Sequence, residues 1–190
     1  MINRIKITKL MSKIKQEELF NVREATQEDV VALTNYWSNL SFDDAFKLGI
    51  DLDKIPPTNE IIDFIEQQIS LQLNERNNYI LIWEVDGIAI GHCDITPIVV
   101  GEYANIHSHI WDKKHIAKGW GERLMRMSLP IFFEKYNLVK IYGVFYALNP
   151  APMKLCIKLG FSFVEEYPTI PGGWSFYQNV KKYELKKVDL

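Results

Sequence analysis

The sequence has few cysteines, no long hydrophobic run and no excess of charge of one sign. Its 190 residues include only two cysteines, Cys93 and Cys156. Two thiols cannot form a disulfide framework, and no Cys/His spacing is typical of a zinc site. We therefore expect no metal and a reducing, cytoplasmic setting. No apolar stretch approaches the roughly 20 residues that a membrane helix needs, so we expect no membrane partner.

The charge balance is nearly neutral. Lys and Arg number 22 against 24 Asp and Glu, which gives a formal net charge of -2. This balance argues against nucleic acid as a partner, because nucleic-acid-binding domains are usually strongly basic. The hydrophobic share of 47% and the chain length suit one domain with a full core.

The first 19 residues differ in composition from the rest of the chain. They form a basic leader that lacks the continuous apolar core of a signal peptide. We expect either a loosely ordered segment or a short surface helix, with the folded domain at 20–190. Met11 offers an alternative translation start within this leader.

Periodicity and turn residues predict the order β-α-α-β-β-β-α-β-α-β-β. The expected strands lie at 20–25, 79–85, 88–98, 103–111, 139–147, 161–167 and 174–185, and the expected helices follow Thr26, occupy 41–73 in two pieces, and span 119–136 and 149–160. The predicted fold is an α/β (α+β) domain. It has a mixed, mostly antiparallel twisted sheet of about seven strands flanked by helices.

A glycine-containing segment, Ile116 to Glu122, follows a predicted strand and opens a long amphipathic helix. Helix N-termini bind phosphates because their first N–H groups are unpaired and the helix dipole adds positive potential. Gly119 and Gly121 would let the backbone approach a phosphate closely, and Lys118 adds a positive charge. A Gly-x-Gly before a helix is also typical of a simple tight turn, so this motif alone is weak.

Two motifs together resemble the GNAT superfamily of N-acetyltransferases. The segment 116–121 resembles its acetyl-CoA loop, Gln/Arg-x-x-Gly-x-Gly/Ala. The segment 149–161 resembles its Asn-x-x-Ala/Ser-x-x-x-Tyr-x-x-x-Gly-Phe helix, and the spacing from Asn149 to Gly160 fits without gaps. The resemblance covers roughly residues 22–185 and is greatest to the RimJ/RimL-type branch, which modifies N-terminal amines of proteins among other substrates.

The resemblance implies an enzyme that moves an acetyl group from acetyl-CoA to a primary amine by direct transfer in a ternary complex. It places backbone N–H groups near the end of the strand 107–111 against the pantetheine arm and the thioester oxygen. The implied acetyl-CoA-binding residues are Ile110, Trp111, Ile116, Ala117, Lys118, Gly119, Trp120, Gly121, Glu122 and Asn149.

Two positions depart from the family pattern. Ile116 stands where Gln or Arg is usual, and we expect weaker CoA binding at worst, because backbone N–H groups hold the phosphates. Cys156 stands where many members have a tyrosine that protonates the leaving thiolate. A thiol leaves readily because its pKa is about 8.5, so water or Cys156 itself could supply the proton. A covalent acetyl carrier is a further role open to Cys156, although no Cys-His signature supports it.

The candidate general bases are His107 and His109, which strand alternation places on one face of the sheet. Either could equally be a neutral histidine packed under a helix. Weaker candidates for bases are Glu84 and Glu102, and for substitute acids Tyr142, Tyr146 and Tyr167.

The acceptor side of the site is harder to predict. The acidic helical segment 43–66 could attract a cationic amine, or it could be a solvated helix face. Aromatic side chains could form an acceptor wall or simply core, namely Trp37, Phe42, Phe46 and Trp174. The acceptor could be a protein N-terminus or side chain, or a small cationic amine.

A non-catalytic acetyl-CoA sensor or interaction module is the alternative function, kept open by Ile116 and Cys156. The chain could be a monomer or a homodimer.

Overall fold

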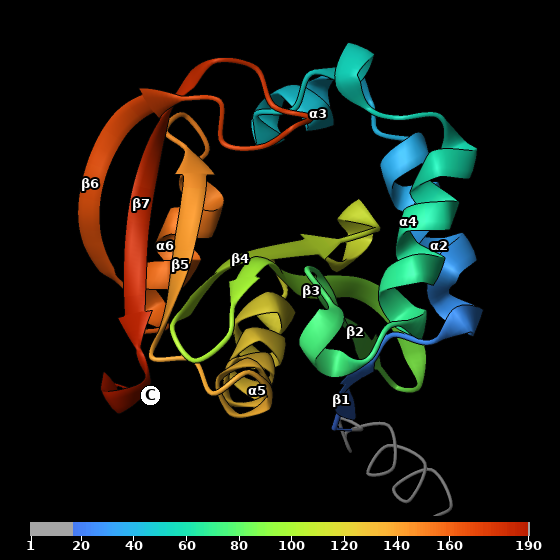
Figure 1. Cartoon of the computed structure of the whole chain (residues 1–190), viewed down its shortest axis with the longest axis horizontal. Helices are drawn as coiled ribbons and strands as arrows, with labels where there is room; N and C mark the ends of the chain where they lie inside the picture. The colour runs from blue at the N-terminus through green and yellow to red at the C-terminus, as the bar shows by residue number, and fades with distance from the viewer. Residues whose placement is uncertain (1–16, 190) are drawn as a thin grey trace, which may run out of the picture.

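A seven-stranded sheet runs through the computed structural model, which describes residues 17–189 (Figure 1). The strands are β1 (Phe20–Glu24), β2 (Tyr79–Val85), β3 (Ile88–Val99), β4 (Tyr103–Ile110), β5 (Lys140–Tyr146), β6 (Ser162–Thr169) and β7 (Gln178–Lys186). They lie in the order β1-β2-β3-β4-β5-β7-β6, and every neighbouring pair is antiparallel except β4 and β5. The predicted mixed, mostly antiparallel sheet is confirmed. The predicted basic leader, apart from residues 17–19, lies outside the described residues.

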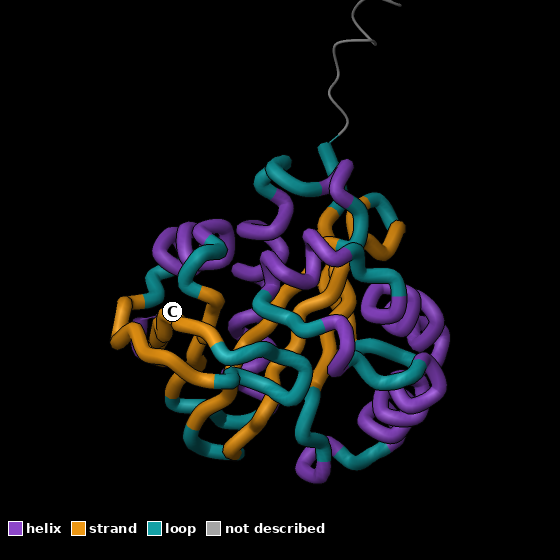
Figure 2. The backbone as a smooth tube through the Cα atoms, turned by 90° about the horizontal axis from the view of Figure 1, so that it is seen from above, coloured by secondary structure: helices purple, strands orange, loops and turns teal. Residues whose placement is uncertain are grey.

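Helices cover both faces of the sheet, as the view from above shows (Figure 2). They are α2 (Val30–Ser38), α3 (Phe42–Leu48), α4 (Thr58–Ser70), α5 (Trp120–Lys135) and α6 (Pro150–Lys158). Within residues 17–189, every helix is too short or too polar to cross a bilayer.

Alternation along β2 divides the interior into two cores. Tyr79, Leu81 and Trp83 point to the face covered by α5 and α6 and join the larger core. Ile80 and Ile82 point to the opposite face and pack with α2 and α4. A strand that is buried on both faces has no solvent-facing side on which polar residues would alternate with apolar ones. Accordingly, five of the seven residues of β2 are aliphatic or tryptophan.

Local sequence signals set several element ends as expected. Asp86 and Gly87 have φ of 54° and 75°, as a two-residue type I′ hairpin turn requires. Asn149 caps α6, where its side chain accepts from the N–H of Ala151 at 3.3 Å. At the other end of α6, Gly160 takes a φ of 91°, and the N–H of Phe161 bonds back to the carbonyl of Cys156.

The last strand was predicted to begin at residue 174, which is wrong. Strand β7 begins at Gln178, because the backbone before it pairs with another segment. Ser175 forms an isolated bridge with Ile50, and the N–H of Asp51 donates to the carbonyl of Trp174 at 2.8 Å. The β6–β7 loop is therefore attached to the end of α3 rather than to β5.

The parallel pair β4 and β5 is joined only at its start. Its paired residues are Tyr103 with Lys140, Ala104 with Ile141, and Asn105 with Tyr142. Beyond these the two strands separate, while β4 stays paired to β3 and β5 stays paired to β7. The sheet is split at its centre, between 106–110 of β4 and 143–146 of β5.

Candidate active site

The split leaves backbone groups of β4 without a strand partner. In an antiparallel pair, alternate residues direct their N–H and C=O groups to the neighbouring strand. The N–H of Trp111 donates to the carbonyl of Ile90 at 2.9 Å, so alternate residues from Trp111 backwards face β3. Ser108 and Ile110 therefore direct their backbone groups into the split. Of the two residues expected to offer backbone N–H groups here, Ile110 fits, whereas the N–H of Trp111 is already bonded.

The glycine-containing loop follows β4 after a short 3-10 helix, Lys113–His115, and ends at the N-terminus of α5. Ala117 and Gly119 both have positive φ, 64° and 80°, and Gly119 is the N-cap residue without a side chain to cap the helix. The N–H groups of the first turn, from Trp120 to Glu122, are therefore free of helical partners. A Cβ added at Gly119 would meet nothing within 4 Å, and one at Gly121 only Ile110 Cδ1 at 3.7 Å. The backbone is open to an approaching anion.

The side chains around this loop leave that backbone uncovered. Lys118 Nζ lies 4.2 Å from the ring centroid of Trp120, and Ile116 is 52% exposed. Glu122 bonds Arg126 at 3.1 Å and lies 3.5 Å from Lys158, so its charge is already compensated. The segment predicted to bind acetyl-CoA thus offers N–H groups and one lysine. Its acidic residue is paired elsewhere.

An apolar pocket lies beside the split, on the face covered by α5 and α6. Its lining residues are Ile106, Ser108, Met125, Phe145, Pro152, Leu155, Cys156, Leu159 and Phe161. Burial raises the pKa of the Cys156 thiol to about 12. Such a thiol is almost entirely protonated at neutral pH and is a poor source of thiolate. This placement works against Cys156 as a covalent acetyl carrier.

His107 and His109 lie on the opposite face of β4, together as alternation predicted. His107 Nε2 lies 3.3 Å from the carbonyl oxygen of Thr96. Because a carbonyl only accepts, the neutral form of His107 that makes this bond carries its proton on Nε2 and its lone pair on Nδ1. The cross-strand neighbour of His107 is Asp94, a buried carboxyl whose pKa burial raises and His107 lowers.

His109 belongs to a cluster that sequence patterns did not reveal. Its Nδ1 lies 2.9 Å from Tyr36 Oη, and its ring stacks on His92 at a centroid distance of 5.0 Å. Trp111 Nε1 donates to His92 Nδ1 at 2.7 Å. Burial lowers the pKa of His109 well below 6.5 and that of His92 to about 3. Both rings are therefore neutral at neutral pH. The sequence analysis missed His92, because its place opposite His109 depends on the register of β3 and β4.

The weaker sequence candidates are placed less favourably. Glu84 bonds Arg23 and Asn21, each at 2.7 Å, and these bonds lower its pKa against the effect of burial. The ring of Tyr142 lies under Lys182, whose Nζ is 4.3 Å from the ring centroid.

Glu102 and Tyr167 lie outside the split. Glu102 is exposed in the β3–β4 turn, and Tyr167 belongs to the edge strand β6. Tyr146, at the end of β5, does face the split, and its partners are aromatic.

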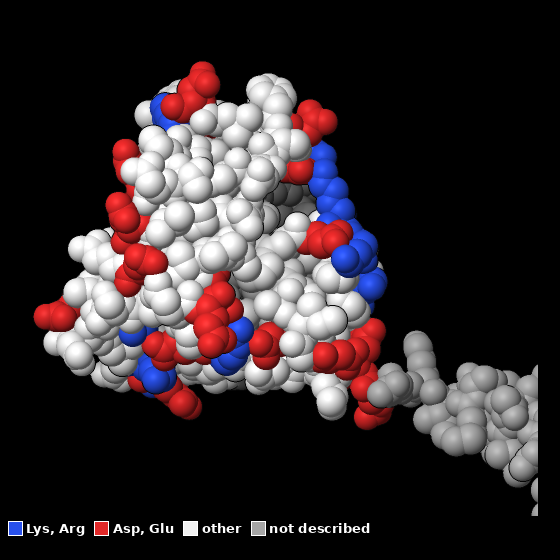
Figure 3. All heavy atoms as spheres, turned by 90° about the vertical axis from the view of Figure 1, so that its right-hand side faces the viewer, with Lys and Arg blue, Asp and Glu red and all other residues white. Residues whose placement is uncertain are grey.

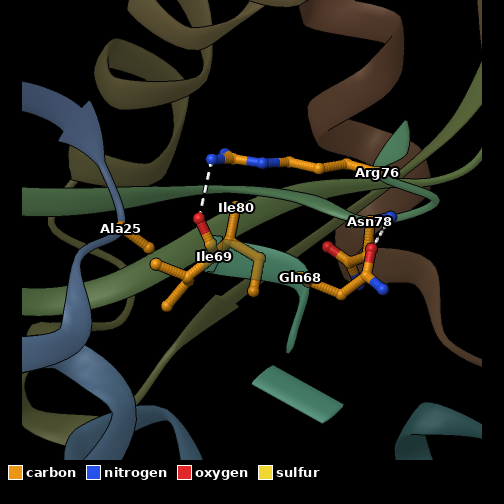
Figure 4. Close-up of a pocket in the computed structure, with 6 residues that line it drawn as sticks. All are labelled: Ala25, Gln68, Ile69, Arg76, Asn78 and Ile80. Carbon is orange, nitrogen blue, oxygen red and sulfur yellow. Dashed lines mark hydrogen bonds between the residues drawn. The ribbon is translucent and has the colours of Figure 1, made fainter. Parts of the chain in front are cut away.

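A second small pocket, near the end of α4, is a structural feature (Figure 4). Arg76 donates there to the carbonyls of Ile69 and Leu71 and to Glu24, while Gln68 accepts from the backbone of Asn78. The guanidinium group is thus occupied in ending the helix.

Comparisons with known proteins agree with this geometry. The model of the acetyltransferase (GNAT) family matches residues 43–161. No curated protein matches the sequence. Among solved structures, the chain is similar to YncA, a putative acetyltransferase from Salmonella typhimurium with acetyl-CoA. The identity is 16%, over 88% of this chain and 93% of that one, with a TM-score of 0.68.

Two further structures are equally similar. The spermidine N-acetyltransferase from Vibrio cholerae, in complex with CoA and spermine, is 20% identical over 90% of this chain and 96% of its own, with a TM-score of 0.70. RimL, a ribosomal L7/L12 alpha-N-protein acetyltransferase in complex with coenzyme A, is 13% identical over 88% and 93%, with a TM-score of 0.71. At such identities the likeness shows the fold, and it does not single out the RimJ/RimL-type branch. Because the family model spans more than half of the sequence, the chain belongs to the GNAT acetyltransferase family.

Proposed function

We propose that this protein transfers an acetyl group from acetyl-CoA to a primary amine by direct transfer in a ternary complex. The observation that carries the proposal is the split between β4 and β5, which opens beside an uncapped helix N-terminus with open glycines. One wall of the split offers unpaired backbone groups, and the adjoining loop offers N–H groups suited to phosphates. An extended phosphorylated cosubstrate fits both.

The loop residues would bind the phosphates of acetyl-CoA, which supplies an activated acyl thioester to the site. The N–H groups from Gly119 to Glu122 point out of the start of α5, and Lys118 adds charge nearby. Ser108 and Ile110 would bond the extended arm through their backbone, as an added strand would. A backbone N–H in this position can also stabilise a developing oxyanion.

His107 is the general base in this proposal. Its Nε2–H is held by Thr96, which leaves the Nδ1 lone pair available to accept a proton from the acceptor ammonium. Asp94 lies opposite in the register and would stabilise the resulting imidazolium. His109 is less suited to this role because burial strongly favours its neutral form.

Among residues 17–189, no side chain is assigned the role of a dedicated acid in this proposal. A thiol with a pKa of about 8.5 leaves readily without one. Cys156 has a pKa of about 12. Transfer of its proton to a thiolate of lower pKa would therefore be thermodynamically unfavourable. We propose that solvent supplies this proton.

The test is a melting experiment with acetyl-CoA, followed by an assay of free CoA release with a panel of amines. A ligand that binds only the folded state must stabilise it, by about 2.7 kcal/mol at a hundredfold excess over Kd. Stabilisation together with amine-dependent CoA release is the expected result, and His107→Gln should reduce release without reducing stabilisation. Stabilisation without release on any amine would support the alternative of a non-catalytic sensor. No stabilisation at millimolar acetyl-CoA would refute the proposed function.

A further inference from the structure

Aromatic side chains form a ring around the mouth of the split, on the face opposite α5 and α6. Trp37, on α2, contacts the ring of His109 at a centroid distance of 4.7 Å and that of Trp174 at 5.3 Å. Two residues beyond Trp174, Phe176 contacts Tyr146 at 5.5 Å. Tyr146 ends β5 and His109 lies near the end of β4, so these side chains run from one side of the split to the other. We call these five residues the aromatic ring.

Helix α3 packs against the part of this ring that Tyr146 and Phe176 form. Phe46 stacks on Phe176 at 5.7 Å and meets Tyr146 edge-on at 6.0 Å, yet 48% of its surface stays exposed. Figure 1 shows α3 beside the β6–β7 loop, at the top of the opening between the two halves of the sheet. An exposed aromatic side chain at this place is available to a bound molecule.

Hydrogen bonds to backbone carbonyls fix the loop that carries Trp174 and Phe176, two of the five residues of the ring. The N–H of Asp51 donates to the carbonyl of Trp174, and Lys54 Nζ donates to that of Ser175 at 2.9 Å. Gln178 Nε2 donates to the carbonyl of Gly49 at 2.7 Å. The aromatic ring is therefore preformed, so a ligand does not have to order the loop when it binds.

Two carboxyl groups on this side of the sheet are paired or buried. Asp44, on α3, bonds Lys113 at 2.8 Å and Ser41 Oγ at 2.6 Å. Asp94 is buried opposite His107, the residue with which the proposed function pairs it. Figure 3 shows a recess on the side of α2 and α4, with acidic and basic side chains together along its margin. The acidic segment 43–66 also holds exposed carboxylates that have no cationic partner among the described residues, namely Asp43, Asp53, Glu60 and Asp63. A polycation is therefore the competing acceptor, and the experiment below includes one.

We propose that the acceptor is a primary amine carried on an aromatic or flat apolar group. The proposal rests on the proposed function and adds the class of acceptor. Aromatic groups bind other aromatic groups edge-to-face or offset-stacked, and the rings here already adopt such edge-to-face contacts with one another. The amine would extend from the aromatic ring into the split, towards His107.

The experiment compares three amines with the full-length protein and acetyl-CoA. They are 2-phenylethylamine, n-butylamine and spermidine, and the readouts are CoA release and the mass of the acetylated product. We expect kcat/KM to be about tenfold higher for 2-phenylethylamine than for either other amine, from aromatic contacts alone.

Variants in the β6–β7 loop assign this preference to the aromatic ring. Trp174→Ala should raise KM for 2-phenylethylamine about tenfold and leave KM for acetyl-CoA unchanged, while Trp174→Phe should largely restore it. The matched control is Tyr177→Ala, an aromatic side chain of the same loop that is 69% exposed and outside the ring. It should change neither constant. Asp44→Asn should leave the order of the three amines unchanged.

The outcomes separate this inference from the proposed function. Spermidine turnover that exceeds turnover of 2-phenylethylamine, or an equal effect of Trp174→Ala on all three amines, would overturn the acceptor class while acetyl transfer stands. Failure of acetyl-CoA to stabilise the protein would overturn both. The melting of each variant is measured first, to show that the variant is folded before its kinetic constants are compared.

Discussion

Gly121→Ala gives the sharpest test of the phosphate site. The substitution should raise the stability of the free protein and reduce the further stabilisation that acetyl-CoA provides. Gly121 lies in the first turn of α5, and an added Cβ would meet only Ile110 Cδ1 at 3.7 Å. Glycine in a helix is about 0.5–1 kcal/mol less favourable than alanine. The free variant should therefore melt about 1–4 °C higher than the wild type, since 1 kcal/mol corresponds to about 2–4 °C at this chain length.

The same Cβ occupies space that we propose for a phosphate. At a hundredfold excess over the wild-type Kd, acetyl-CoA should stabilise the wild type by about 2.7 kcal/mol. A tenfold weaker Kd in the variant would reduce this to about 1.4 kcal/mol at the same concentration. Scanning calorimetry or dye-based melting, with and without acetyl-CoA, measures both changes in one series.

Gly119→Ala serves as the companion variant. At a φ of 80°, alanine should cost about 1–2 kcal/mol, so the free protein should melt lower. Gly101→Ala is the matched control, because Gly101 has a φ of 78°, has open space around it and lies in the β3–β4 turn. It should lower the free melting temperature without affecting the acetyl-CoA shift. An undiminished shift in Gly121→Ala would refute the assignment of the first turn of α5 as the phosphate site.

Three further predictions concern other parts of the structure. Incubation with acetyl-CoA and no amine should leave no acetyl adduct on Cys156 in intact mass spectra, since its thiol has a pKa of about 12; an adduct would restore the covalent route. The buried His92, with a pKa of about 3, binds fewer protons folded than unfolded between about pH 6.5 and 3. The free energy of unfolding should therefore fall as pH falls in that window, by about 1.4 kcal/mol per pH unit from this group. In His92→Gln, the free energy of unfolding measured by denaturation at several pH values should depend less on pH. Gly49→Ala should destabilise the fold by about 1–3 kcal/mol, because its φ is 76° and its Cβ would collide with Gln178; unchanged denaturation midpoints would contradict this.

Local patterns predicted the parts of the fold and site that depend on neighbouring residues. A glycine pair after a strand indicated the loop before α5, and Asn149 with Gly160 marked both ends of α6. Period-two alternation placed His107 and His109 on one face, because strand geometry alone determines it.

Contacts between distant segments could not be predicted in this way. The pairing of His109 with Tyr36 depends on how α2 packs on β4, and the position of His92 depends on the register of β3. The start of β7 was misplaced because Ser175 pairs with Ile50, a partner 125 residues earlier in the chain. A sequence pattern carries no information on which of two strands a loop will meet.

The place of β7 in the sheet has a consequence for how the protein is made. Among the described strands, β6 pairs only with β7, and β7 in turn joins it to β5. While the chain is being synthesised, β6 therefore has no partner until residues 178–186 have left the ribosome. The N-terminal half of the sheet, β1 to β4, can assemble earlier because its pairs are consecutive apart from the α2–α4 excursion. Nascent chains arrested shortly before residue 186 should then hold a folded first half and an unpaired β6 edge, which is the state most exposed to chaperones and proteases.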